Sequence, residues 1–309
     1  MGLIVDIYKK NFLQRFDRDP AIPYYSPGDF PGLVCEEGVF RGGFGADVRY
    51  YFFGFPGYEA GKLILFCPGM GPGHAAYLAE IVTLCRAGLR VLTLDYTGCG
   101  ASGGERLPSV NAPARDAMGL LELLRPEAEI IPVGHSLGGY TALNLARMLP
   151  EVRRAVVISG FVDIVDEMTG FLKFRPLAWP VGRFERKLDP ELGDHGNLSY
   201  LRTTEDRLLW IHSADDPMVN YRQNAGKVAK AGNPNIRLIT AEGKKHNPQY
   251  TSEALRKMNE WIGGYNRFLS ENKTASPEER KDYFADKPIG GMTKQDPEVW
   301  GEILKFIAD

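Results

Sequence analysis

The chain has 309 residues, of which 44% are hydrophobic and 25% charged, and its net charge is −2. It can bury a large core, and its balanced charge favours neither nucleic acid nor a membrane surface as a partner. No segment has the length and apolarity of a membrane span or a signal peptide, and the four scattered cysteines are typical of a reducing compartment, so we expect a cytoplasmic location.

Two strand-like runs, Val34–Phe40 and Ala46–Phe55, flank a glycine-rich turn and predict an antiparallel hairpin. From residue 62 onward, apolar strands alternate with helical segments, which predicts an α/β fold with a mostly parallel sheet covered on both faces. The expected strands are Leu63–Cys67, Arg90–Leu94, Glu129–Val133, Ala155–Ser159, Leu208–His212 and Ile236–Thr240. The expected helices lie near Ala75–Ala87, Ala112–Leu124, Leu137–Leu149 and Tyr221–Ala231.

Residues 161–206 break this alternation. The interval is too long for a simple crossover, and it begins at the carboxyl end of a strand, where open α/β sheets bind ligands. Its prolines and its aromatic residues Phe171, Phe174 and Trp179 predict a small helical cap. Helices are expected again near Ser252–Ser270 and Pro297–Ile307, on either side of a polar stretch. We therefore predict a single domain over residues 1–309, with a cap insertion at about 161–206 and a helical C-terminal extension at about 249–309.

The stretch Gly134-His135-Ser136-Leu137-Gly138 fits the pattern G-x-S-x-G between a predicted strand and a predicted helix. A serine on such a turn is strained and exposed, and the flanking glycines let the helix pass close to the strand. The simpler alternative is a glycine-rich helix N-terminus. The strand before the motif and the helix after it favour a nucleophile elbow with Ser136 as the attacking group.

A serine nucleophile needs a base and a group that orients that base. The loop after strand Leu208–His212 carries Asp215 and Asp216, and the loop after strand Ile236–Thr240 carries His246. We predict His246 as the base and Asp216 as its partner, with Asp215 as an alternative. The chain order Ser, Asp, His is that of one class of serine hydrolase triads.

With these motifs the chain resembles the α/β-hydrolase superfamily, in particular its bacterial members, from the hairpin to the last helix. The loop Asp95–Ser102 is similar to a conserved loop of that family. The resemblance implies an oxyanion hole formed by the backbone N–H groups of Leu137 and Met70, and it makes Asp163 a further alternative for the acid. The chain departs from the family pattern at Pro68-Gly69, where His-Gly is usual, at Ser213, where glycine is usual, and in the long segment after His246.

Gly69 to His74 also imitates the glycine-rich fingerprint of dinucleotide-binding folds. The imitation fails, because His74 stands where the third glycine is needed and a hairpin precedes the strand. We predict His74 at the pocket wall or at a helix start. The other histidines, His135, His195 and His212, are predicted to be structural.

The sequence therefore predicts a serine hydrolase that cleaves a carboxylic ester or related small acyl compound through an acyl-enzyme, without a metal or an organic cofactor. A peptidase, a thioesterase or an acyltransferase with the same triad is an alternative, as is a non-catalytic binding protein on the same fold. Phe171, Phe174 and Trp179 are candidates for an acyl pocket or, equally, for packing within the cap.

Overall fold

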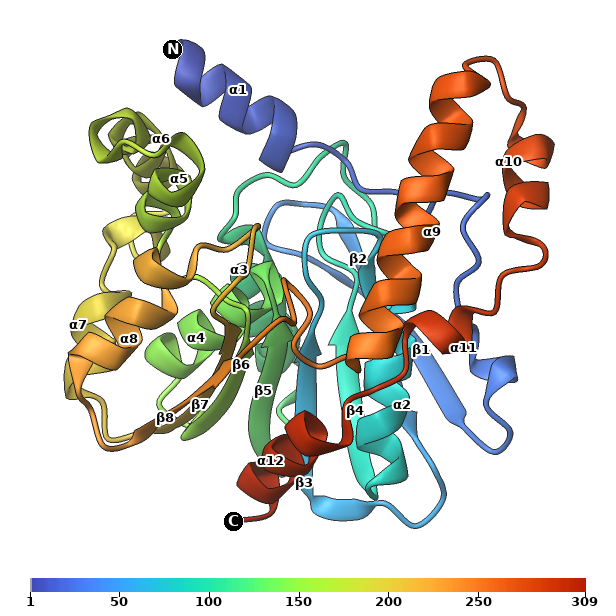
Figure 1. Cartoon of the computed structure of the whole chain (residues 1–309). Helices are drawn as coiled ribbons and strands as arrows, with labels where there is room; N and C mark the ends of the chain where they lie inside the picture. The colour runs from blue at the N-terminus through green and yellow to red at the C-terminus, as the bar shows by residue number, and fades with distance from the viewer. Residues whose placement is uncertain (1) are drawn as a thin grey trace.

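A single sheet of eight strands lies at the centre of the computed structural model, which describes residues 2–309 (Figure 1). The strands are β1 (Val34–Arg41), β2 (Asp47–Gly54), β3 (Glu59–Cys67), β4 (Leu89–Leu94), β5 (Glu129–His135), β6 (Arg154–Ile158), β7 (Arg207–Ser213) and β8 (Ile236–Ala241). Their order is β1-β2-β4-β3-β5-β6-β7-β8, and only the pairs β1–β2 and β2–β4 are antiparallel. The predicted hairpin and the mostly parallel sheet are both confirmed.

The helices cover both faces and both ends of this sheet. They are α1 (Leu3–Phe12), α2 (Leu78–Arg86), α3 (Ala112–Leu124), α4 (Leu137–Met148), α5 (Ile164–Leu172), α6 (Arg175–Leu188), α7 (Asn197–Thr203), α8 (Ala225–Ala231), α9 (Ser252–Glu271), α10 (Pro277–Phe284), α11 (Ile289–Met292) and α12 (Pro297–Ala308). In Figure 1, α1, α5 and α6 lie at one upper corner, and α9 and α10 lie across from them.

Strand β3 shows how the core is divided between the two faces. Successive side chains of a strand point to opposite faces, and here both faces are apolar. Leu63 and Leu65 pack in the cluster that contains side chains of α3, α4 and α8. Ile64 and Phe66 pack in the other cluster, against α2 and α12. The sheet is therefore buried on both sides, and its loops at the carboxyl ends of the strands are left to build a site.

The segment after β6 is helical, as the sequence predicts. Helix α5 begins at Asp163, whose carboxylate accepts a hydrogen bond from the N–H of Asp166 at 2.8 Å. Helices α6 and α7 follow before the chain returns to the sheet at β7. Helices α5 and α6 stand above the strand ends on one side of the molecule, whereas α7 lies lower, beside α8 (Figure 1).

Two helical regions were not predicted. Helix α1 is too short to be stable alone, and its buried Tyr8 packs against the α6 residue Phe184. In the polar stretch of the predicted helical C-terminal extension, where no separate helix was predicted, α10 begins with a capping box between Ser276 and Glu279. It packs against α9 through aromatic rings, including Tyr265. Both helices depend on contacts between distant segments, which local patterns do not reveal.

Candidate active site

Ser136 occupies a sharp turn between β5 and α4. Its φ and ψ are 58° and −120°, a conformation that few non-glycine residues adopt. Its N–H donates to the carbonyl of Ile158 at 2.9 Å, which ties the turn to β6. A Cβ at Gly134 would overlap the Gly138 carbonyl, and one at Gly138 would overlap the Cys67 carbonyl. Both glycines are thus required by close backbone contact, and the expected strand, turn and helix are present.

His246 and Asp216 meet across the loops that follow β8 and β7. The Nδ1 atom of His246 lies 2.8 Å from Oδ2 of Asp216, a hydrogen bond in which the imidazole N–H donates. The other carboxylate oxygen accepts the N–H groups of Met218 at 2.8 Å and Val219 at 3.0 Å. Asp216 is buried, and these bonds fix the position of its carboxyl group.

A second histidine, His212, lies beneath this pair. Its Nε2 donates to the carbonyl of Val219 at 2.9 Å and lies 3.4 Å from Oδ2 of Asp216. Burial lowers the pKa of His212, so the ring is neutral near pH 7. It was expected to be structural, and its contacts are with the loop that carries the acid.

The two alternative acids have other partners. Asp215 accepts hydrogen bonds from the hydroxyl of Ser213 and the N–H of Lys245, and these two residues lower its pKa to about 2. Asp163 caps α5 and faces His195 at 3.9 Å, and burial together with the nearby Asp166 raises its pKa to about 7. Of the three carboxylates, Asp216 is the one hydrogen-bonded to His246.

The ring of His135 makes two hydrogen bonds that the sequence did not indicate. Its Nε2 lies 2.8 Å from the backbone carbonyl of His246, and its Nδ1 lies 3.0 Å from the hydroxyl of Tyr77. A carbonyl only accepts, so Nε2 carries the proton and Nδ1 accepts from Tyr77. Burial lowers the pKa of His135 to about 3, so this neutral form persists. The side chain was expected to point away from the site, but it connects the serine turn to the histidine loop.

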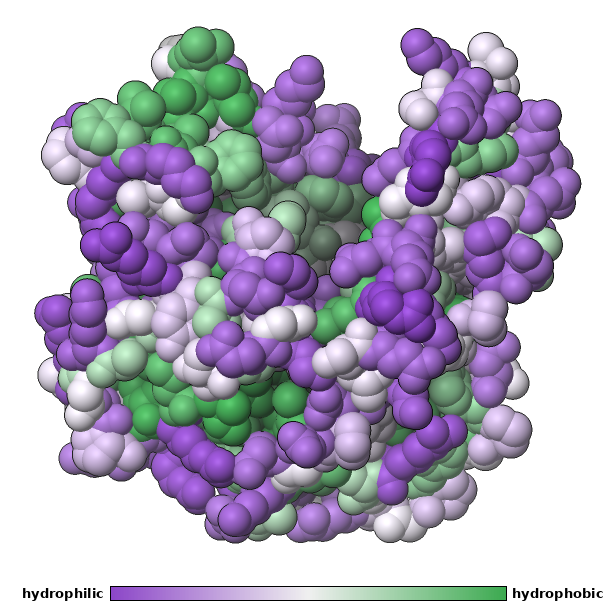
Figure 2. Space-filling model, viewed as in Figure 1, coloured by the Kyte–Doolittle hydropathy of each residue, from purple (hydrophilic) through white to green (hydrophobic). Residues whose placement is uncertain are grey.

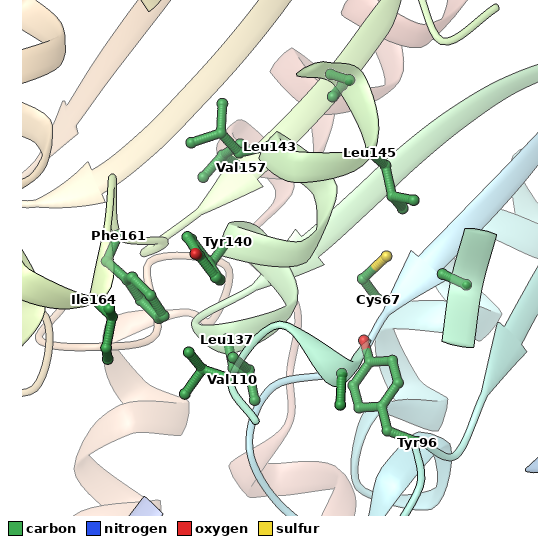
Figure 3. Packing of buried hydrophobic residues seen from close by; sticks show 14 of the residues in the cluster. Cys67, Tyr96, Val110, Leu137, Tyr140, Leu143, Leu145, Val157, Phe161 and Ile164 are labelled. Atoms are coloured by element: carbon green, nitrogen blue, oxygen red, sulfur yellow. The ribbon is translucent and has the colours of Figure 1, made fainter. Parts of the chain in front are cut away.

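Ser136 and His246 line one cavity of about 460 Å³. Most of its other lining side chains are apolar: Phe12, Phe16, Met70, Val110, Leu137, Phe161, Ile164, Phe171, Pro217, Met218 and Val219. Behind its wall, Tyr140 stacks on Phe161 with ring centroids 4.3 Å apart, and Leu137 lies beside Val110 (Figure 3). The cavity is shaped to hold an uncharged, largely apolar group.

One carboxyl group lines the same cavity. Glu167, on cap helix α5, is held by the side-chain amide of Asn224 at 3.4 Å. Burial and then the negative charge of Asp216 raise the pKa of Glu167 to about 8. Near pH 7 it is therefore mostly a neutral acid that can donate a hydrogen bond. A glutamate in an amphipathic cap helix gave no signal in the sequence.

Four side chains were predicted to form the substrate pocket, and the structure places one of them there. Phe171 lines the cavity, whereas Phe174 is exposed and Trp179 lines a separate groove beside α6. His74 lies away from the cavity, at the start of the 3₁₀ helix Gly73–Tyr77, so the helix start is confirmed and the pocket wall is wrong. Its ring lies 2.8 Å from Asp95 and packs against Tyr51. Phe174 and Trp179 lie outside the cavity because the cap presents only one face to it. His74 lies outside it because the loop after β3 directs the histidine ring toward the hairpin.

The two predicted oxyanion groups also lie at the cavity. Leu137 is the first residue of α4, so its N–H has no partner within the helix. Met70 follows β3 in a loop whose Pro68 carbonyl accepts the hydroxyl of Tyr96 at 3.1 Å. Two backbone amides near a serine at a helix N-terminus can stabilise negative charge.

The glycine-rich loop that imitates a dinucleotide fingerprint is filled by protein. The carboxylate of Asp95 accepts the N–H groups of His74 at 2.8 Å and Ala101 at 2.9 Å, and a Cβ at Gly73 would overlap it. Over residues 2–309, no three His, Cys, Asp or Glu side chains are grouped to hold a metal ion. Among the helices of that same range, none has the length and apolarity to span a membrane.

Known proteins are similar to part of this chain, and one family model matches the part that carries the elbow. The family model described as serine aminopeptidase, S33, matches residues 58–205. The provisionally named carbamate hydrolase RutD of Azorhizobium caulinodans is 32% identical over 130 residues, 41% of this chain and 45% of that protein. The provisionally named esterase PIR7A of rice, Oryza sativa, is 24% identical over 151 residues, 48% of this chain and 54% of that protein.

The matches thus span about half the length of these curated relatives. Among solved structures, the esterase Pf2001 of Pyrococcus furiosus superimposes with a TM-score of 0.56 over 84% of this chain and 98% of that chain, at 17% identity. That likeness shows the fold. The chain has the α/β-hydrolase fold.

Proposed function

We propose that this protein is a serine hydrolase that cleaves carboxylic esters through an acyl-enzyme intermediate. The observation that carries the proposal is the 2.8 Å hydrogen bond between Asp216 and His246, at a cavity that His246 shares with Ser136. A histidine oriented by a buried carboxylate is what a serine needs to become nucleophilic.

In the proposed reaction, His246 Nε2 takes the hydroxyl proton as Ser136 Oγ attacks the ester carbonyl. The N–H groups of Leu137 and Met70 stabilise the oxyanion. Collapse of the tetrahedral intermediate breaks the bond to the alcohol, which leaves with the proton from His246. Water then adds to the acyl-enzyme by the same proton path and releases the acid. Asp216 keeps Nδ1 protonated throughout and stabilises the imidazolium.

The cavity favours an apolar acyl or alcohol group. Its lining is rich in aromatic and aliphatic side chains, and its one carboxyl group, Glu167, is mostly neutral near pH 7. A permanently charged group on the substrate would have no fixed counter-ion among the side chains that line the cavity. Small to medium uncharged esters fit a space of about 460 Å³.

Amide, carbamate or thioester cleavage by the same residues is the second candidate. The family description, serine aminopeptidase, and the name of the Azorhizobium relative point in that direction. A non-catalytic role is less consistent with the backbone of Ser136, whose φ of 58° and ψ of −120° lie outside the left-handed helical region, because residues held in such sparsely populated conformations cluster at active sites.

The test compares substrate classes on one protein. Initial rates are measured with p-nitrophenyl esters from acetate to dodecanoate, with alanine and proline p-nitroanilides, and with an aryl carbamate. Ser136→Ala should lose activity on every substrate cleaved. The matched control is Ser159→Ala, which removes a buried serine that also has a positive φ and directly follows the neighbouring strand β6, but does not line the cavity.

The expected result is ester cleavage that exceeds amide cleavage and depends on Ser136. Faster turnover of the anilides or the carbamate would move the assignment to the second candidate. Ester hydrolysis that survives in Ser136→Ala would overturn the proposed nucleophile.

A further inference from the structure

Exposed apolar side chains gather at one corner of the molecule. Within residues 2–309, fourteen large hydrophobic side chains are exposed, and half of them belong to α1, α5, α6 and the α5–α6 turn. We call these seven the apolar corner: Leu3, Ile7, Phe171, Phe174, Leu177, Trp179 and Leu188. Figure 2 shows hydrophobic residues collected over this corner, where Figure 1 places α1, α5 and α6 together. A contiguous apolar surface of this kind usually marks a contact with another phase or molecule.

The helices of the apolar corner are fixed to one another. The Tyr8 hydroxyl on α1 donates to the buried carboxylate of Glu185 on α6 at 2.8 Å. The ring of Phe12 meets that of Phe171 edge to face at 6.2 Å, which joins α1 to α5. The corner is therefore one surface and not three separate helix ends.

The same corner is strongly basic. The helices of the corner and the turn between them, residues 2–12 and 164–188, contain seven Lys and Arg and four Asp and Glu, a formal net charge of +3 in a chain whose total is −2. Lys10, Arg183 and Lys187 have no charged or hydrogen-bonding partner within residues 2–309, whereas Lys173 interacts with the carboxyl group of Glu167. The net charge of the whole chain therefore does not reveal this cluster of basic side chains, because the fold brings together segments that are distant in the sequence.

A groove beside α6 concentrates this charge. It has a volume of about 790 Å³ and is lined by Arg175, Arg183, Arg186 and His195, with Trp179 at its wall. Arg175 is already paired with the buried carboxyl group of Asp166 at 2.6 Å, so Arg183 and Arg186 are the guanidinium groups of the groove that remain for an anion. Guanidinium groups bind phosphate oxygens with two parallel hydrogen bonds, and a tryptophan ring sits well at the boundary between lipid headgroups and acyl chains.

We propose that the apolar corner docks onto an anionic phospholipid bilayer, with lipid phosphates in the arginine groove and the exposed aromatic and aliphatic side chains among the acyl chains. A basic amphipathic helix with tryptophan on its surface has this affinity. A second copy of the chain is a poor occupant, because two surfaces of net charge +3 repel each other. The inference departs from our expectation that no membrane partner exists, which rested on the total charge.

The position of the corner links binding to the cavity. Phe171 belongs both to the corner and to the lining of the cavity that holds Ser136, and the exposed Met218 lies at the same cavity. Docking would bring the cavity opening to the lipid surface. The substrate class that follows is an amphiphilic ester that partitions into membranes; this last step rests on the proposed function, whereas the docking itself does not.

Binding is tested with the full chain carrying Ser136→Ala, so that no lipid is consumed and the result is independent of hydrolysis. Flotation is measured with vesicles of phosphatidylcholine alone and with vesicles containing 30% phosphatidylglycerol. We expect binding to the anionic vesicles at least tenfold tighter than to the neutral ones, and release by 0.5 M NaCl. Trp179 fluorescence should shift to shorter wavelength on binding, and Trp179→Ala should abolish the shift.

Paired variants locate the surface. Arg183→Gln with Lys187→Gln should weaken binding about 25-fold, since each basic residue near an anionic surface contributes roughly a fivefold factor. The matched control, Lys273→Gln with Lys281→Gln, removes the same charge from the exposed region of α9 and α10 and should bind like the parent.

Equal binding to both vesicle types, or equal weakening by both pairs, would overturn the proposal. So would self-association through the corner in the absence of lipid, detected by sedimentation, because the occupant would then be a second copy. Binding to free inorganic phosphate with no vesicle binding would assign the groove to a soluble anion and would also refute docking.

Discussion

Replacing Asp216 by asparagine should leave the fold intact and remove most of the activity. Oδ1 of Asp216 accepts the N–H groups of Met218 and Val219, and an asparagine can keep those bonds only by placing its carbonyl there. Its amide then faces Nδ1 of His246, where the carboxylate lay at 2.8 Å. Two donors cannot bond, so His246 must deprotonate Nδ1 and move its proton to Nε2.

The size of the effect follows from that tautomer. With Nε2 protonated, the imidazole cannot accept the proton of Ser136. A wrong tautomer in a serine triad lowers kcat by about 10⁴, which corresponds to about 5 kcal/mol of transition-state stabilisation. The loss in folding stability is smaller, about 1–2 kcal/mol, because the loop keeps its backbone hydrogen bonds.

The assay is kcat and KM on the best p-nitrophenyl ester, with Tm measured in parallel. Asp215→Asn is the matched control: its carbonyl can still accept from Ser213 and Lys245, and only a surface ion pair with Lys245 at 2.9 Å is lost. Its kcat should stay within about threefold of the parent, as expected for a solvent-exposed pair. The reverse pattern would transfer the acid role to Asp215, and insensitivity of both sites would point to Asp163.

Three further changes follow from the same geometry. His135→Phe removes the hydrogen bond that holds the His246 carbonyl at 2.8 Å. In steady-state kinetics, kcat should therefore fall about tenfold while KM changes little. An unchanged kcat would show that the loop carrying His246 keeps its position without this bond. Glu167 binds its proton more tightly in the folded chain than in the unfolded chain, with a pKa of about 8 against an ordinary 4.5. The free energy of unfolding that this proton contributes is therefore full below pH 4.5 and is lost as the pH rises through 8. Urea unfolding should therefore show Glu167→Gln gaining stability relative to the parent between pH 5 and pH 9, and a constant difference would contradict this. Phe171→Ala enlarges the cavity and should raise the ratio of long-chain to short-chain ester turnover several-fold. Trp179 lines the other groove, so Trp179→Ala should leave that ratio unchanged.

Much of the fold was predictable because it depends on local signals. The hairpin, the alternation of strands and helices and the cap all follow from periodicity and from turn residues. The position of β4 between β2 and β3 does not, since strand order is decided by long-range pairing. Helix α1 was missed for a similar reason, because the burial of Tyr8 against Phe184 stabilises it.

The site divides in the same way. Ser136, Asp216 and His246 were found because each follows a strand in a recognisable motif. His135 and Glu167 were not, because their roles come from contacts with Tyr77 and Asn224, which belong to distant segments. The pocket residues Phe174 and Trp179 were misplaced because composition shows that a cap is aromatic without showing which helix face meets the cavity.

The central claim is that Ser136 is a nucleophile activated by His246. The most direct measurement is labelling with a fluorophosphonate, followed by mass mapping of the modified peptide. We expect one label per chain, on the peptide that contains Ser136, with labelling rates reduced at least 100-fold in His246→Ala and Asp216→Asn. A label on another residue, or equal labelling in His246→Ala, would contradict the account.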